Sequence, residues 1–199
     1  MSQLLVETQL WNTNSLLTEN VDKQNGNVIV EGILATAEVK NGNGRYYPRE
    51  LWERELGKYQ ELIDQRRATG ELDHPESQVV NLKNVSHVIR EYWWDGDQVM
   101  GRIEILPTPS GNILTELIKA GVTVGVSSRG VGSLEQNGNV MEVQDDFELL
   151  CWDFVSTPSN PGSFMGVLQE GKQHTSVDYS TVNDIIREIL CSKGSCPVL

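Results

Sequence analysis

The sequence predicts an α+β protein that is mainly β, with two helices inserted among antiparallel strands. Runs rich in β-branched and aromatic residues recur over residues 27–157, and such runs are typical of strands. The pairs Asp95–Gly96 and Asn137–Gly138 separate several of them and indicate tight turns. Helical periodicity is clear in two segments of this region. The repeated alternation of strands and helices that is typical of a parallel sheet is not found.

The expected elements of the first half begin with one long or two short strands over Asn27–Lys40. Segment Pro48–Ala68 has apolar residues at i, i+4 and i+7 and starts with Pro, so it is predicted to be an amphipathic helix, with Gly70 as its C-cap. Asn84–Leu106 is predicted to form two strands around the turn at residues 95–96.

In the second half, Ser110–Gly121 is predicted to be a short helix, capped by Ser110 or Asn112 and closed by Gly121. The stretch "GVTVGVSSRGVGS", residues 121–133, is interpreted as strand–loop–strand. Phe147–Thr157 is a nearly continuous apolar run and predicts a buried strand.

Composition divides the chain near residue 168. Residues 1–168 are expected to form the main domain, in which residues 1–26 could be irregular. Residues 169–199 combine a polar linker with a C-terminal helical tail. The chain of 199 residues is long enough for one domain with its own core.

Bulk properties exclude several classes of function. The formal net charge of −12 argues against nucleic-acid binding, which needs a basic face. No apolar run approaches the roughly 18 residues of a membrane span, and the N-terminus lacks the basic region of a signal peptide. Three Cys, an odd number, fit a reducing compartment. We expect a soluble cytoplasmic protein with no nucleic-acid or membrane partner.

The glycine-rich stretch does not fit two familiar motifs. A P-loop needs Lys and then Ser or Thr after its second Gly, but Val131 and Gly132 follow Gly130. The hydrolase elbow G-x-S-x-G lacks its last Gly after Ser127. Local sequence alone therefore favours an ordinary glycine-rich turn.

Two residues elsewhere have the character of a catalytic pair. Asp153 interrupts an apolar strand, and a buried carboxylate needs a partner; this partner could be a backbone cap, an Arg such as Arg102 or Arg129, or a His ring. His74 precedes Pro75 on a loop, where functional groups concentrate, although a surface His in a polar turn is the simpler interpretation.

The other His and Cys residues give weaker signals. His87 lies in a strand-like run, where a packing role is expected, and His174 lies in the polar tail. Cys191 and Cys196 lack a second pair for a tetrahedral metal site. We expect neither a metal nor another cofactor.

Three segments taken together resemble the prohead proteases of tailed bacteriophages. They are "GELDHP" with His74, "GVSSRGVGSL" with Ser127 and "CWDFVSTPSNPG" with Asp153. The resemblance is greatest to the capsid-maturation proteases of T-even-like myophages. It covers residues 27–166 and includes the flanking segments "VEGILATAEVKNGNGRYYP" and "EYWWDGDQVMGRIEI".

This resemblance implies a serine endopeptidase with an antiparallel β-barrel flanked by helices, distantly related to the herpesvirus assemblins. On the matching positions, His74 is the general base, Ser127 the nucleophile and Asp153 the third member, with Ser128 as the fallback nucleophile. The Arg129 and Gly130 backbone amides are candidate oxyanion donors. Assemblins use a second His as third member, whereas this chain offers Asp153, or Cys151 if the register differs by two.

The resemblance also implies substrates and a place of action. Such enzymes act in the host cytoplasm inside the assembling prohead, on scaffolding or core proteins, on the major capsid protein and on themselves, and they could self-associate. They cut after Glu, with an apolar residue two positions earlier and a small residue next. Leu168–Gly171 fits this pattern and predicts self-cleavage between Glu170 and Gly171. Ile29–Gly32 also fits, but as part of a strand it should be protected.

Two further questions stay open from the sequence. Arg45, Arg102 or Arg129 could each pair with a substrate carboxylate. A catalytically inactive relative that serves as a scaffold- or capsid-binding component is the alternative function.

Overall fold

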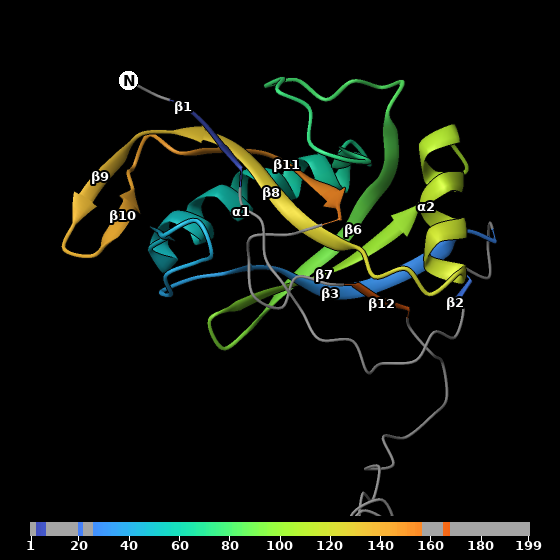
Figure 1. The fold of residues 1–199 in the computed structure, drawn as a ribbon, viewed down its shortest axis with the longest axis horizontal. Helices are drawn as coiled ribbons and strands as arrows, with labels where there is room; N and C mark the ends of the chain where they lie inside the picture. The colour runs from blue at the N-terminus through green and yellow to red at the C-terminus, as the bar shows by residue number, and fades with distance from the viewer. Residues whose placement is uncertain (1–2, 7–19, 22–25, 157–164, 168–199) are drawn as a thin grey trace, which may run out of the picture. The chain divides into compact units, whose positions relative to one another are not determined.

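The described part of the chain is mainly β with two helices (Figure 1), which confirms the predicted fold class. The computed structural model describes residues 3–6, 20–21, 26–156 and 165–167. Its strands form a six-stranded sheet and two three-stranded sheets. The expected closure into a barrel is not observed among these residues, because the three sheets do not join into one closed ladder.

The elements follow one another along the chain in the following order: β1 (Gln3–Val6), β2 (Asn20–Val21), β3 (Val28–Thr36), β4 (Arg45–Tyr46), α1 (Arg49–Asp64), β5 (Thr69–Glu71), β6 (Val85–Asp95), β7 (Gln98–Ile105), α2 (Pro109–Lys119), β8 (Gly125–Gly132), β9 (Leu134–Asn137), β10 (Val140–Val143), β11 (Glu148–Val155) and β12 (Met165–Val167).

The larger sheet has the order β12-β3-β7-β6-β5, with β2 also paired to β3. All its pairings are antiparallel. The strands β6 and β7 form the hairpin predicted around residues 95–96, where Gly96 has a positive φ of 57°. In the second sheet β8 lies between β1 and β11, and these two pairings are also antiparallel.

Helix α1 has the amphipathic face predicted from its periodicity. Its buried side chains include Leu51, Trp52, Leu56, Tyr59 and Ile63, and they join the aromatic and aliphatic core. Burial of this apolar face is what holds a helix of 16 residues in place.

The caps of both helices differ from the sequence prediction. Helix α1 ends at Asp64, and Gly70 is not its cap but the central residue of β5. The N-cap of α2 is Thr108, whose Oγ1 accepts a hydrogen bond from the Gly111 amide, rather than Ser110 or Asn112. Gly121 has the positive φ of 76° expected of a residue that closes a helix.

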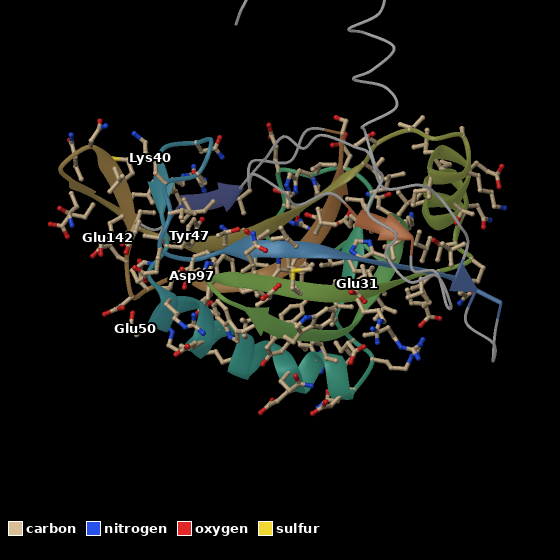
Figure 2. All side chains as sticks on the ribbon, turned by 90° about the horizontal axis from the view of Figure 1, so that it is seen from below. Glu31, Lys40, Tyr47, Glu50, Asp97 and Glu142 are labelled. Carbon is tan, nitrogen blue, oxygen red and sulfur yellow. The ribbon has the colours of Figure 1, made fainter. Side chains whose placement is uncertain are left out.

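The strand–loop–strand expected over residues 121–133 is wrong, because residues 125–132 form one continuous strand, β8. The glycines serve close packing rather than a turn: a Cβ on Gly130 would lie 2.4 Å from the Phe147 ring. The predicted hairpin at 137–138 is confirmed as β9–β10, with Gly138 at φ 58°. Lys40 Nζ donates to the Asn139 carbonyl at 2.7 Å and ties this hairpin to the segment that follows β3 (Figure 2).

No helix among the described residues is long and apolar enough to span a membrane. The predicted linker and tail at 169–199, with Glu170 and Gly171, and most of segment 1–26 lie outside the described residues.

Candidate active site

The antiparallel pair β8–β11 sets Ser127 directly opposite Asp153. Residues opposite each other on neighbouring strands project to the same face of the sheet, and the next pair on that face is Arg129 with Cys151. A bulge between Leu149 and Cys151 precedes these residues on β11. All four residues on this face are fully buried.

The Asp153 carboxylate is held from three directions. Its Oδ2 lies 2.8 Å from His74 Nδ1, and its Oδ1 accepts from the Glu71 amide at 2.9 Å. Arg129 Nη2 donates to Oδ1 at 3.1 Å, and Arg129 Nε lies 2.8 Å from Oδ2 in an ion pair. Asp153 therefore has all three kinds of partner considered from the sequence: a His, an Arg and a backbone amide.

His74 reaches Asp153 from a turn that follows β5. The turn depends on Asp73, whose φ of 70° is left-handed and is tolerated by Asp. The Asp73 amide donates to the Phe154 carbonyl at 2.7 Å, and its side chain accepts from the His74 amide at 3.0 Å. These bonds fix the backbone on both sides of the turn, and Pro75 keeps it from continuing as a helix.

Arg129 and Glu71 form a buried ion pair beside Asp153, and Glu71 was not among the residues predicted to belong to the site. Arg129 Nη2 lies 3.0 Å from Glu71 Oε1, and both side chains are almost inaccessible to solvent. Arg129 Nη1 also donates to the Ser77 carbonyl at 2.6 Å. Glu71 stands in the quoted motif "GELDHP", but its burial follows from a three-residue strand that has no clear sequence signal.

Ser127 and Ser128 lie on opposite faces of β8, because side chains alternate along a strand. Ser127 lies on the face of Asp153. Ser128 is paired with Trp152 and lies beside a small cavity. The residues around this cavity are Leu34, Ala35, Thr36, Asn41, Tyr47, Trp52 and Ser128.

The polar atoms that face a substrate in a serine protease are unpaired. His74 Nε2 and Ser127 Oγ are both buried and form no hydrogen bond, with each other or with another described residue. Unpaired buried polar atoms are rare in folded proteins and cost about 1–3 kcal/mol each. Six other buried side-chain atoms of the described residues also lack a hydrogen-bond partner, so this feature agrees with a substrate site without being specific to one.

The environment keeps Asp153 ionised. Burial is the largest single influence and raises its pKa, but the hydrogen bonds from His74 and the Glu71 amide and the charge of Arg129 together outweigh it. The net result is a pKa below the ordinary value of 3.8. A carboxylate that is ionised at neutral pH can orient His74 through Nδ1 and leave Nε2 available.

Comparison with known proteins identifies the family. The sequence model of the family "Prohead core protein serine protease" matches residues 5–172. The chain belongs to this family. It is 36% identical to the prohead core protein protease of Enterobacteria phage T4 over 141 residues, which are 68% of this chain and 66% of that protein. The chain thus aligns with slightly less than two thirds of this relative's length.

A solved structure agrees with the family. The structure of the bacteriophage T4 capsid assembly protease matches with a TM-score of 0.69 and 30% sequence identity. The match covers 81% of this chain and 98% of that one.

Two other titratable residues near Asp153 in this chain, Cys151 and His87, are poor candidates for proton transfer. Burial, followed by the charge of Asp153, raises the pKa of Cys151 far above its ordinary value, so its thiol stays neutral and donates to Asp153 Oδ1 at 3.4 Å. Burial lowers the pKa of His87 to about 4. His87 Nε2 donates to the Trp152 carbonyl at 3.0 Å, which matches the packing role expected of it.

The backbone amides of Arg129 and Gly130 lie inside the three-stranded sheet. Arg129 is opposite Val6 of β1 and Cys151 of β11, and Gly130 is opposite Leu5 and Leu149. Each residue of a central strand directs its amide toward one neighbouring strand. Donation to an oxyanion from either amide therefore requires a neighbouring strand to give way.

The three arginines considered as readers of a substrate carboxylate have different surroundings. The Arg129 side chain is fully buried and paired with Glu71 and Asp153, so a substrate carboxylate has no access to it. Arg102 pairs with Glu31 at 3.0 Å and also with Glu91. Arg45 lies on β4 beside the β9–β10 hairpin. Among the described residues no group of three or more His, Cys, Asp and Glu side chains could hold a metal ion.

Proposed function

We propose that this protein is a serine endopeptidase in which Ser127 is the nucleophile, His74 the general base and Asp153 the residue that orients His74. The observation that carries the proposal is the 2.8 Å contact between Asp153 Oδ2 and His74 Nδ1, on the face of the sheet where Ser127 stands opposite Asp153. Family membership supports the same reaction.

In this mechanism Ser127 Oγ attacks the carbonyl carbon of the scissile bond, and its proton passes to His74 Nε2. The electron pair of the carbonyl moves onto its oxygen. His74 then gives its proton to the leaving amine, and water releases the acyl group. Ser127 and His74 are not hydrogen-bonded in this structure; catalytic hydrogen bonds are often long without substrate and shorten when it binds.

The proposed substrates are scaffolding or core proteins and the major capsid protein, cut after Glu within the assembling prohead in the host cytoplasm. The relatives named as a prohead core protein protease and a capsid assembly protease support this setting. The chain would also cut itself between Glu170 and Gly171 and release its tail, and it could self-associate.

The test compares intact masses after expression and incubation. Wild-type protein and Ser128→Ala should lose fragment 171–199, while Ser127→Ala should keep it. Loss of the tail from all three would show that a host protease removes it. Purified wild-type protein should also cut a peptide with an apolar–x–Glu–Gly sequence.

A binding component without activity is the second candidate, favoured by the full burial of Ser127 and its lack of a bond to His74. It predicts that wild-type protein cuts neither its tail nor the peptide, even when co-expressed with the scaffold proteins and assembled into particles.

A further inference from the structure

The guanidinium of Arg129 joins three separate parts of the site. It contacts Asp153 on β11 and Glu71 on β5, and it donates to the carbonyl of Ser77 in the loop that carries His74. The side chain is 0% exposed. Burial of a cation without partners is costly, so these contacts hold the two strands and the loop in one arrangement.

Glu71 extends the same network into the loop. Its Oε1 accepts from Arg129 and also from the Asn81 amide at 3.0 Å. Its own amide donates to Asp153 Oδ1. Glu71 and Arg129 thus fix both ends of the segment that positions the His74 ring.

The charges in this network are unequal. Asp153 and Glu71 contribute two negative charges and Arg129 one positive charge, and all three groups are buried. With neutral His74 one negative charge remains uncompensated, whereas a protonated His74 makes the cluster neutral. The imidazolium that forms when Ser127 loses its proton therefore adds the charge that balances the cluster, and charges interact strongly away from water.

We propose that Arg129 and Glu71 are positioning residues for His74, Arg129 by fixing Asp153 and the His74 loop, and Glu71 by supplying the extra negative charge that stabilises protonated His74. The inference rests on the proposed function. A structural role alone would change stability without changing how His74 titrates.

Other titratable groups border this cluster, and none of them is substituted in the variants compared below. They are Asp73 in the His74 loop, Cys151 on β11, His87 on β6 and Tyr59 on α1.

The experiment uses the full chain and compares Glu71→Gln, Arg129→Gln and the double variant. Peptide cleavage is measured as kcat/KM against pH. The acid limb of this profile is the fall of kcat/KM at low pH, where His74 takes up a proton and can no longer act as the base. Loss of Glu71 removes a negative charge, so the acid limb should move to lower pH by about half a unit or more. Loss of Arg129 should move it to higher pH. The double variant has the same net charge in the cluster as wild type, so its acid limb should return to the wild-type pH. Its kcat should stay at least about 10-fold below that of wild type, because the contacts of Arg129 and Glu71 that hold Asp153 and the His74 loop are lost.

A second readout does not depend on catalysis. The His74 imidazole signal is titrated by NMR in the Ser127→Ala background, where the same opposite displacements are expected. If wild-type protein is inactive but these displacements occur, the proposed function fails and the electrostatic role of Glu71 stands.

The matched control is Glu104→Gln, an equally buried carboxylate that pairs with Arg66 and Arg90; it should leave the acid limb unchanged. If Arg129→Gln does not fold, Glu71→Gln alone decides, because it preserves the shape of the side chain. An acid limb and a His74 titration that are unchanged in Glu71→Gln, or displaced to higher pH, would overturn the proposal.

Discussion

At the scale of single residues, His87 makes the fold sensitive to acid. The ring is fully buried in its neutral form: Nε2 donates to the Trp152 carbonyl, and Nδ1 lies 2.9 Å from Ser86 Oγ. Burial lowers its pKa from 6.5 to about 4. Above pH 6.5 it is neutral in both states. As the pH falls from 6.5 to 4 the unfolded chain binds the proton first, so the free energy of unfolding should fall by about 3 kcal/mol.

The check is a series of urea unfolding curves between pH 4 and 7.5 for wild type and His87→Gln. The variant should be less stable at pH 7 because it loses the ring contact with Phe154. Its stability should fall less steeply between pH 6.5 and 4, so the two curves converge. Parallel curves over this window would contradict the assignment of the acid sensitivity to His87.

The residues of the candidate site differ in how far the sequence could predict them. Asp153 could be singled out because a lone acid in an apolar strand requires a partner. The family resemblance favoured Ser127 over Ser128, and the register of β8 against β11 adds that Ser127 lies opposite Asp153. Glu71 could not be recognised, because its burial depends on a pairing with Arg129, 58 residues away in sequence.

At the scale of elements, β5 depends on the absence of a side chain at Gly70. A Cβ there would lie 1.9 Å from the Trp152 carbonyl oxygen and 2.5 Å from the His87 ring. The oxygen belongs to the backbone of β11 and cannot move aside alone. Gly70→Ala should therefore lower the free energy of unfolding by about 3 kcal/mol and move the adjacent Glu71 and His74 away from Asp153, with loss of peptide cleavage.

Gly57→Ala is the matched control for this prediction. Gly57 lies on α1, and a Cβ there would have nothing within 4 Å. The substitution should raise the free energy of unfolding by about 0.5–1 kcal/mol, because Ala is the better helix former, and leave cleavage unchanged. Urea unfolding measures both; equal effects of the two substitutions would contradict the close packing of β5 on β11.

Close packing of the backbone at glycines, as at Gly70, also explains the incorrect prediction for residues 121–133. Glycines are frequent in turns, so the sequence indicated a break between two strands. In β8, however, Gly130 and Gly132 allow the strand to pass close to Phe147. Close approach depends on tertiary packing, whereas the periodicity of α1 is a local property and predicted that helix well.

At the scale of the whole molecule, local patterns predicted the longer strands β3, β6, β7 and β11, but neither the short strand β5 nor the partition of the strands into sheets. The hairpins β6–β7 and β9–β10 follow from local turns. The pairing of β1 with β8 joins residues 3–6 to 129–132, and the pairing of β3 with β7 joins residues 29–36 to 98–104. Such long-range pairings are selected by the complete core and have no local signal.

The pairing of β3 leads to a prediction about where the protein can cut itself. Ile29–Gly32 has the same apolar–x–Glu–Gly pattern as residues 168–171. Glu31 lies on β3, opposite Gly166 of β12 on one side and Arg102 of β7 on the other. A protease binds its substrate as an extended, unpaired segment, so cleavage after Glu31 would require β3 to leave the middle of the sheet.

Folded wild-type protein should therefore give no fragment 1–31 on incubation, while it loses fragment 171–199. Free peptides that span residues 27–36 and 165–174 should both be cut after Glu, at rates within about 10-fold of each other, because their local patterns are alike. Mass spectrometry measures all three reactions. Fragment 1–31 from folded protein would mean that β3 opens readily. A free 27–36 peptide that resists cleavage would mean that the residues around Glu31, rather than the sheet, protect this position.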